Sequence, residues 1–127
     1  MPTYCRTFPG HVEQVGCARR WAREVLTGCS CAGDAVLIVS ELGTNAVTHT
    51  TSPDFHVTIH RARGSVTITV TDHGGSTTAP HLAKPYDHGV HGRGLAVVTT
   101  LATDVRFTRN AHGHEVAAHL ASEVPAC

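Results

Sequence analysis

The sequence lacks a charge excess of either sign, because its 127 residues carry 10 Lys and Arg against 10 Asp and Glu. A formal net charge of zero provides no strongly basic face, which argues against direct nucleic-acid binding. The sequence also lacks any apolar stretch of 18 or more residues and an N-terminal apolar run behind a basic segment. Neither membrane insertion nor export has a signal, so we expect a cytoplasmic protein.

Cysteine and histidine patterns typical of disulfide or metal scaffolds are missing too. The 5 cysteines are an odd number in a chain without an export signal, which favours reduced thiols. Cys29 and Cys31 are separated by one residue and no second pair follows, so they do not match the usual zinc spacing. The 11 histidines form no helical i, i+4 pair beside a carboxylate, which favours surface histidines, with a zinc protein as the alternative.

The length is typical of one domain over residues 1–127, which can bury roughly 68% of its unfolded surface. Hydrophobic periodicity predicts five strands and three helices. The predicted strands are residues 3–8, 55–62, 65–71, 104–109 and 114–121, and the predicted helices are residues 11–26, a segment ending near 49, and a segment starting near 92 or 94. We expect a two-layer α/β sandwich, with three helices on one face of a mostly antiparallel five-stranded sheet and Thr and His on the other.

A polar stripe runs along the predicted helix that ends near His49. At about 100° per residue, Glu41, Asn45 and His49 line the margin of its apolar side. That apolar side consists of Ala35, Ile38, Val39, Leu42 and Ala46. A carboxylate one turn from a carboxamide can accept a proton or orient water while the carboxamide offers a hard oxygen to a cation. An amphipathic helix with solvated polar edges explains the same residues.

Two further features lie where predicted elements end or begin. A period of two places Asp72 on the inner face with Val70, where the strand ends. A buried carboxylate needs a partner, so Asp72 either caps a local turn or accepts a hydrogen bond from a ligand. After a long loop, Gly92 and Gly94 come before a predicted helix, which fits an anion cradle as well as a flexible loop end.

In order and spacing, these motifs resemble the GHKL ATPase superfamily with its Bergerat ATP-binding fold. Glu41–His49 (ELGTNAVTH) resembles the N box, Asp72–Gly75 (DHGG) the first glycine box, and Gly92–Leu95 (GRGL) the second. Within the superfamily, Phe8-Pro9-Gly10 and Ser40-Glu41-Leu42 look most like the anti-sigma-factor serine/threonine kinases. The resemblance covers nearly the whole chain.

The resemblance implies roles for particular residues. Glu41 would act as the general base, and Asn45 would hold Mg²⁺ between the phosphates of ATP. Asp72 would accept a hydrogen bond from the adenine amino group, while Arg93 or Lys84 would neutralise phosphate charge. The implied nucleotide-binding residues are Asn45, His49, Asp72, Gly74, Gly92, Arg93, Gly94 and Leu95, with residues 76–91 as the ATP lid.

The implied function is an ATP-dependent anti-sigma factor and serine-protein kinase. It would hold a sigma factor, phosphorylate an anti-sigma antagonist protein and thereby switch partners, and a homodimer is expected. A non-catalytic, nucleotide-sensing binding module is the alternative, and a sensor-histidine-kinase catalytic domain is less favoured because no phosphoacceptor helix pair accompanies it. The last predicted strand carries His114-Glu115-Val116-Ala117 where the family often has a basic residue and an aromatic.

Overall fold

One antiparallel sheet forms the base of the molecule, in the spatial order β1-β2-β3-β5-β4. The computed structural model describes residues 2–48, 52–73, 90–110 and 113–122, without the side chains of residues 90–94 and 110. The strands are β1 (Thr3–Pro9), β2 (Asp54–Ala62), β3 (Ser65–Asp72), β4 (Asp104–Asn110) and β5 (Gly113–Ala121). Because β5 lies between β3 and β4, the end of β3 is a direct neighbour of the start of β5.

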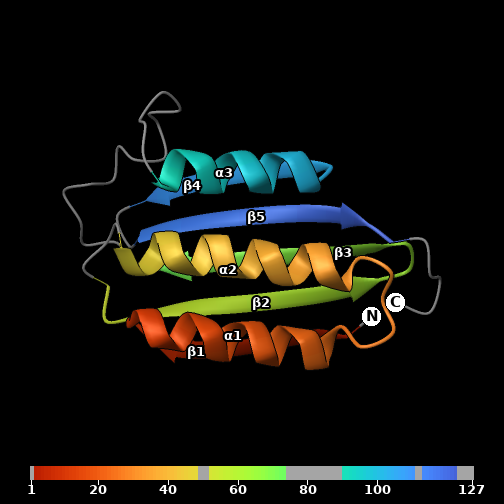
Figure 1. Cartoon of the computed structure of the whole chain (residues 1–127), viewed down its shortest axis with the longest axis horizontal. Helices are drawn as coiled ribbons and strands as arrows, with labels where there is room; N and C mark the ends of the chain where they lie inside the picture. The colour runs from red at the N-terminus through yellow and green to blue at the C-terminus, as the bar shows by residue number, and fades with distance from the viewer. Residues whose placement is uncertain (1, 49–51, 74–89, 111–112, 123–127) are drawn as a thin grey trace.

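The helices α1 (Val12–Val25), α2 (Ala32–Thr48) and α3 (Val90–Leu101) cover one face of this sheet (Figure 1). The central helix α2 packs on β2, β3 and β5, while α1 lies over β1 and β2 and α3 contacts β4. The predicted two-layer α/β sandwich with a five-stranded sheet is therefore confirmed. No helix among the described residues is both long enough and apolar enough to cross a membrane.

Helix α3 differs from its predicted bounds because it begins at Val90, before Gly92 and Gly94. Glycine lowers helix propensity by about 1 kcal/mol but does not forbid helical dihedrals, so the two glycines do not mark the helix start. The last two residues of the lid predicted over 76–91 consequently belong to α3. The rest of that lid, residues 76–89, lies outside the described part of the chain.

The core lies between the helices and the inner face of the sheet. Phe8 stacks on Phe55 with ring centroids 5.4 Å apart, and Trp21 meets Phe8 edge-on at 5.8 Å. A Cβ on Gly43 would lie 3.4 Å from the Phe55 ring, so the glycine lets α2 approach β2 closely. The inward residues of β2 and β3 alternate along each strand and are Phe55, Val57, Ile59, Val66, Ile68 and Val70. This is the period of two that strand geometry requires, and it puts Asp72 on the same face as Val70.

Phe107 is an inward residue of β4 that stays exposed. It is opposite Val116 in the β4–β5 register and so shares the inward face, as its position in the sequence indicates. Its side chain is nevertheless 41% exposed. Phe107 lies on β4, the outermost strand, where only β5 is a neighbour within the sheet. An edge position gives an inward side chain fewer neighbours, a difference that strand periodicity does not encode.

The outer face of the sheet is polar, as predicted. Hydrogen bonds join Thr3 Oγ1 to His60 Nδ1 at 2.7 Å and Thr67 Oγ1 to His119 Nδ1 at 2.6 Å. The register places these four residues in one row across β1, β2, β3 and β5. Threonine and histidine thus alternate along the row, and each hydroxyl finds a cross-strand partner.

Candidate nucleotide site

The ends of four helices and strands, three of which carry predicted motifs, lie at one end of the molecule. Figure 1 shows the last turn of α2, the end of β3, the start of α3 and the start of β5 at this end. Helix α2 packs directly against β3 and α3, so the N-box helix lies between the two glycine-box segments. The tertiary structure therefore brings together segments that are separated by tens of residues in the sequence.

Helix α2 contributes to the site a half-buried polar margin, which lies beside the buried apolar side of the helix. Glu41 and Asn45 are both intermediate in exposure and lie about 6 Å apart along the helix axis. The predicted apolar side of the helix is buried and consists of Ala35, Ile38, Val39, Leu42 and Ala46. A carboxylate and a carboxamide are thus fixed at the edge of the core, where they remain accessible to a ligand. His49, the third member of the predicted stripe, lies outside the described residues.

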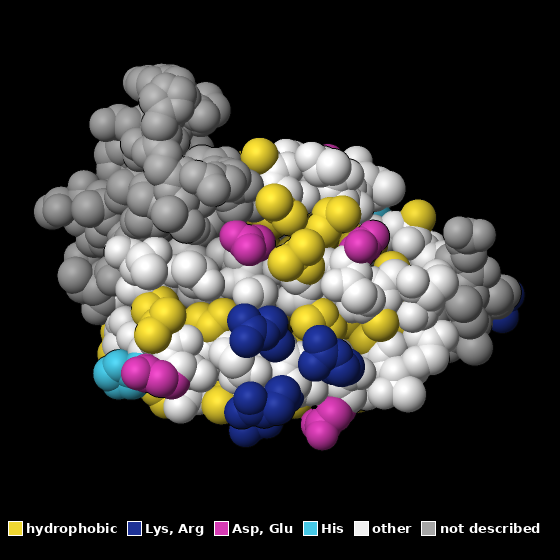
Figure 2. Space-filling view, viewed as in Figure 1, with side chains coloured by type: hydrophobic (Ala, Val, Ile, Leu, Met, Phe, Trp, Pro, Cys, Tyr) yellow, Lys and Arg dark blue, Asp and Glu magenta, His cyan; other side chains and the backbone are white. Residues whose placement is uncertain are grey.

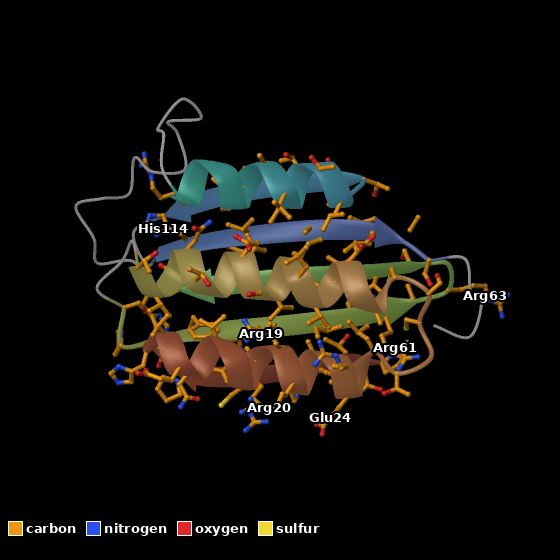
Figure 3. All side chains as sticks on the ribbon, in the orientation of Figure 1. Arg19, Arg20, Glu24, Arg61, Arg63 and His114 are labelled. Carbon is orange, nitrogen blue, oxygen red and sulfur yellow. The ribbon has the colours of Figure 1, made fainter. Side chains whose placement is uncertain are left out.

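The β3 contribution is a buried carboxylate on the inner face. Asp72 is 7% exposed, and its Oδ1 lies 3.1 Å from Nδ1 of His114, which is also 7% exposed. The two residues are register partners across β3 and β5. The inward direction predicted for Asp72 is therefore confirmed, and one of its partners is a side chain from the neighbouring strand. Figure 3 shows His114 at the same end of the molecule as the other motifs.

Gly113 makes this pairing possible. Its φ of +149° lies in a region that L side chains rarely adopt, and a Cβ there would meet the Asp72 carbonyl oxygen at 1.9 Å. Only a residue without a side chain lets β5 begin so close to the end of β3. The sequence by itself indicated no role in the site for His114. A Gly-His pair at the start of a strand was the available signal, but it does not reveal which strand lies opposite.

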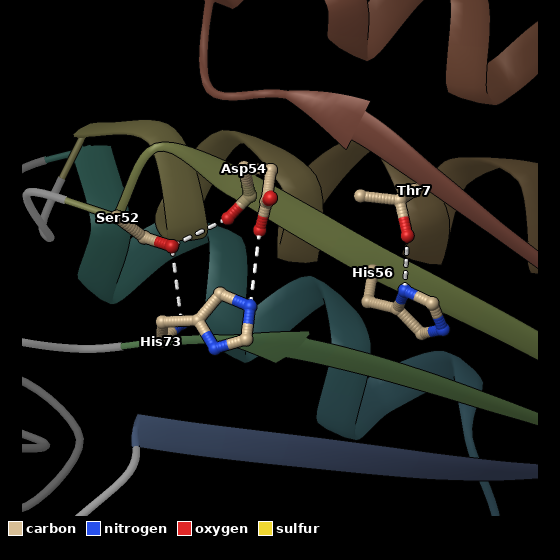
Figure 4. A network of polar contacts seen from close by, with 5 residues as sticks. All are labelled: Thr7, Ser52, Asp54, His56 and His73. Atoms are coloured by element: carbon tan, nitrogen blue, oxygen red, sulfur yellow. Dashed lines mark hydrogen bonds and ion pairs between the residues drawn. The ribbon is translucent and has the colours of Figure 1, made fainter.

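A polar network joins the end of β3 to the start of β2 (Figure 4). The His73 backbone N–H donates to Ser52 Oγ at 3.0 Å, and the Ser52 hydroxyl donates to the Asp54 carbonyl. His73 Nε2 also lies 3.2 Å from Asp54 Oδ1. The chain entering β2 and the chain leaving β3 are thereby tied together at His73, the second residue of the first glycine box. Gly74 itself lies outside the described residues.

Helix α3 presents its N-terminal end at the same place. Gly92 is the third residue of the helix and Gly94 the fifth, while the Arg93 side chain is not described. The first four N–H groups of a helix have no intrahelical acceptor, so the Gly92 N–H is among the donors available to an anion. Leu95 is half-buried and packs against the core, which anchors this helical turn.

Basic side chains gather on the helical face away from this end (Figure 2). Helix α1 contributes Arg19, Arg20 and Arg23, which are exposed as a solvated face requires. Arg19 Nη1 also donates to Ser40 Oγ at 3.1 Å and so links α1 to the residue before Glu41. The Ser40 hydroxyl thus accepts a hydrogen bond that links α1 to α2, which is a structural reason for a hydroxyl at this position.

The outer face carries a separate, shallow hollow. Its volume is about 270 Å³, and its lining residues are Thr67, Asp104, Arg106, Ala117 and His119. These residues lie on the sheet face opposite the helices, so the hollow is not part of the nucleotide site. Within the described ranges, no three His, Cys, Asp or Glu side chains are grouped as a metal site would require.

Comparison with known proteins agrees with this geometry. Residues 8–120 match the histidine kinase-like ATPase domain family, so the chain belongs to that family. The crystal structure of the RsbU and RsbW domains of Rv1364c from Mycobacterium tuberculosis superposes on 98% of this chain with a TM-score of 0.72 and 23% sequence identity. This chain spans 34% of the length of that protein chain. No curated protein matches the sequence significantly. The resemblance to GHKL ATPases and the Bergerat fold are both confirmed.

Proposed function

We propose that this chain binds ATP and Mg²⁺ and acts as an anti-sigma factor and serine-protein kinase. The observation that supports the proposal most directly is the buried Asp72 carboxylate at the end of the molecule where α2, the helix that carries Glu41 and Asn45, ends. Family membership supports the nucleotide, and the similarity to a structure with an RsbW domain supports the anti-sigma branch.

The residues present fit ATP in their chemistry. A carboxylate can accept several hydrogen bonds, so the adenine amino group would donate to Asp72 beside His114. Asn45 Oδ1 is a hard oxygen suited to Mg²⁺, and Gly92 lies among the free N–H groups of α3. Gly74, Gly94 and Leu95 would complete the binding surface, and Arg93 would add positive charge.

When bound, ATP would supply the phosphoryl group for transfer to a serine hydroxyl of the partner protein. In this proposal, a Glu41 carboxylate oxygen would take the hydroxyl proton while the serine oxygen bonds to the γ-phosphorus and the bond from that phosphorus to the departing ADP oxygen breaks. Half-burial at the margin of α2 restricts the Glu41 side chain while leaving it accessible. Asn45, one turn further along, would hold the cation on the same helix margin as the proton acceptor Glu41.

Partner switching would follow from the phosphorylation state of the antagonist. The unphosphorylated antagonist would displace the sigma factor, and the phosphorylated antagonist would release the chain to bind the sigma factor again. We place this exchange in the cytoplasm and expect a homodimer, with no direct contact to nucleic acid.

The test is transfer of radiolabelled phosphate from ATP to a cognate antagonist. Glu41→Ala is expected to reduce transfer about 100-fold or more while ATP affinity and melting temperature stay near wild type. Glu24→Ala, at an exposed glutamate of α1, is the matched control and should transfer normally. An alanine variant at position 41 with full activity would exclude Glu41 as the general base.

A non-catalytic binding module of the same fold is the second candidate. It is favoured by the last strand, where His114 and Glu115 stand in place of the basic and aromatic residues often found in the family. This candidate predicts nucleotide-dependent partner binding without a phosphorylated product. Calorimetric titration of ATP with and without Mg²⁺ on wild type, Asp72→Asn and Asn45→Ala tests the nucleotide site that both candidates share.

A further inference from the structure

His114 and Asp72 form a buried side-chain pair in a place where the family resemblance assigned no role to histidine. Their contact of 3.1 Å joins Nδ1 of the ring to Oδ1 of the carboxylate, and each residue is 7% exposed. The pair spans 42 positions in the sequence and depends on β5 lying next to β3. Gly113 permits the close approach, because any Cβ there would collide with the Asp72 backbone.

The contact constrains the orientation of the Asp72 carboxylate. An ionised carboxylate only accepts hydrogen bonds, so the bridging hydrogen is carried by His114 Nδ1. A charge-assisted bond of this kind fixes the plane in which the carboxylate oxygens lie. Asp72 is thereby held ready to receive a hydrogen-bond donor from a ligand.

We propose that His114 is a positioning residue that selects nucleotides whose base presents an amino group to Asp72. The inference rests on the proposed nucleotide function and extends it to base specificity. Guanine carries an oxo group where adenine carries its amino group, and an acceptor facing an acceptor is repulsive. By keeping Asp72 an oriented acceptor, His114 would favour adenine without touching the base itself.

A second histidine on the same strand provides a matched control. His119 lies on β5 as well, and its Nδ1 likewise bonds a cross-strand oxygen, Thr67 Oγ1, at 2.6 Å. Its side chain is exposed on the outer face, however, whereas His114 is buried on the inner one. Replacing each histidine separately therefore distinguishes an effect at the Asp72 carboxylate from a general effect of altering β5.

The experiment compares two ligands by calorimetry: ATP and purine riboside triphosphate, which has hydrogen in place of the amino group. Wild type is expected to bind ATP at least about tenfold more tightly than the analogue. His114→Leu removes the donor and should lose about tenfold in ATP affinity with analogue affinity within twofold of wild type. His114→Asn, whose amide nitrogen can replace Nδ1, should restore the preference, and His119→Leu should leave it unchanged.

Several outcomes overturn the inference. Equal weakening of both ligands by His114→Leu would mean that the ring only supports packing, and unchanged ATP affinity would mean that it has no role in binding. If the leucine variant does not fold, His114→Gln takes its place in the comparison. The glutamine amide lies one bond further from the backbone than the asparagine amide, so His114→Gln should lose the preference for ATP that His114→Asn keeps. If the wild-type protein binds ATP without preferring it to the analogue, the inference about His114 is refuted but the proposed function is not. If the wild-type protein binds neither nucleotide, the proposed function is refuted and this inference with it.

Discussion

Replacing Gly113 by alanine should destabilise the protein by about 2–6 kcal/mol. The new Cβ would lie 1.9 Å from the Asp72 carbonyl oxygen, whereas real Cβ atoms essentially never come within 3.0 Å of such an atom. The start of β5 must therefore move away from β3. Because His114 follows directly, its contact with Asp72 should break in the same movement.

The expected loss in the free energy of unfolding of Gly113→Ala has two parts. Holding alanine at a φ of +149° costs about 1–3 kcal/mol. Separating the buried Asp72–His114 pair leaves a polar group without its partner and costs about 1–3 kcal/mol more. For a chain of this length, about 4 °C of melting temperature corresponds to each kcal/mol, so we expect a loss of about 10 °C or more.

Urea unfolding followed by circular dichroism measures this free energy, and Gly28→Ala supplies the control. Gly28 also has a positive φ, +89°, but a Cβ there meets nothing within 4 Å. Gly28→Ala should thus show the backbone strain alone, about 1 kcal/mol. Equal losses for the two variants would refute the argument that the contact with Asp72 requires glycine at position 113.

Three other substitutions test the packing by the same unfolding measurement. Phe8→Ala should cost about 3–5 kcal/mol, because the ring is 1% exposed and packs on two aromatic neighbours; a loss below 1 kcal/mol would contradict that packing. Gly16→Ala should stabilise α1 by about 0.5–1 kcal/mol, since a Cβ there makes only ordinary contacts, and a lower stability would reveal a clash. Arg61→Ala should cost about 1–2 kcal/mol, because Arg61 Nη1 donates to the carbonyl of Val25 at the end of α1 at 2.8 Å; no change would show that this cap is dispensable.

Much of the fold was predictable because its signals are local. The apolar side of α2 follows from a 3.6-residue period, and the inner faces of β2 and β3 follow from a period of two. The same period placed Asp72 inward. Element ends were less accurate, since α3 begins at Val90 although the glycines at 92 and 94 suggested a later start. Helix ends depend on local propensity only weakly and vary with tertiary contacts.

By itself, the sequence determined which residues face inward, which motifs match the family and which polar side chains lie along the margin of α2. Only the tertiary structure decided that β5 lies between β3 and β4, that His114 consequently meets Asp72, and that Phe107 on the outer strand stays exposed. The physical reason is that side-chain direction repeats with the local backbone period, whereas strand order is a property of the whole packed sheet. A contact across 42 residues therefore leaves no periodic trace in the chain.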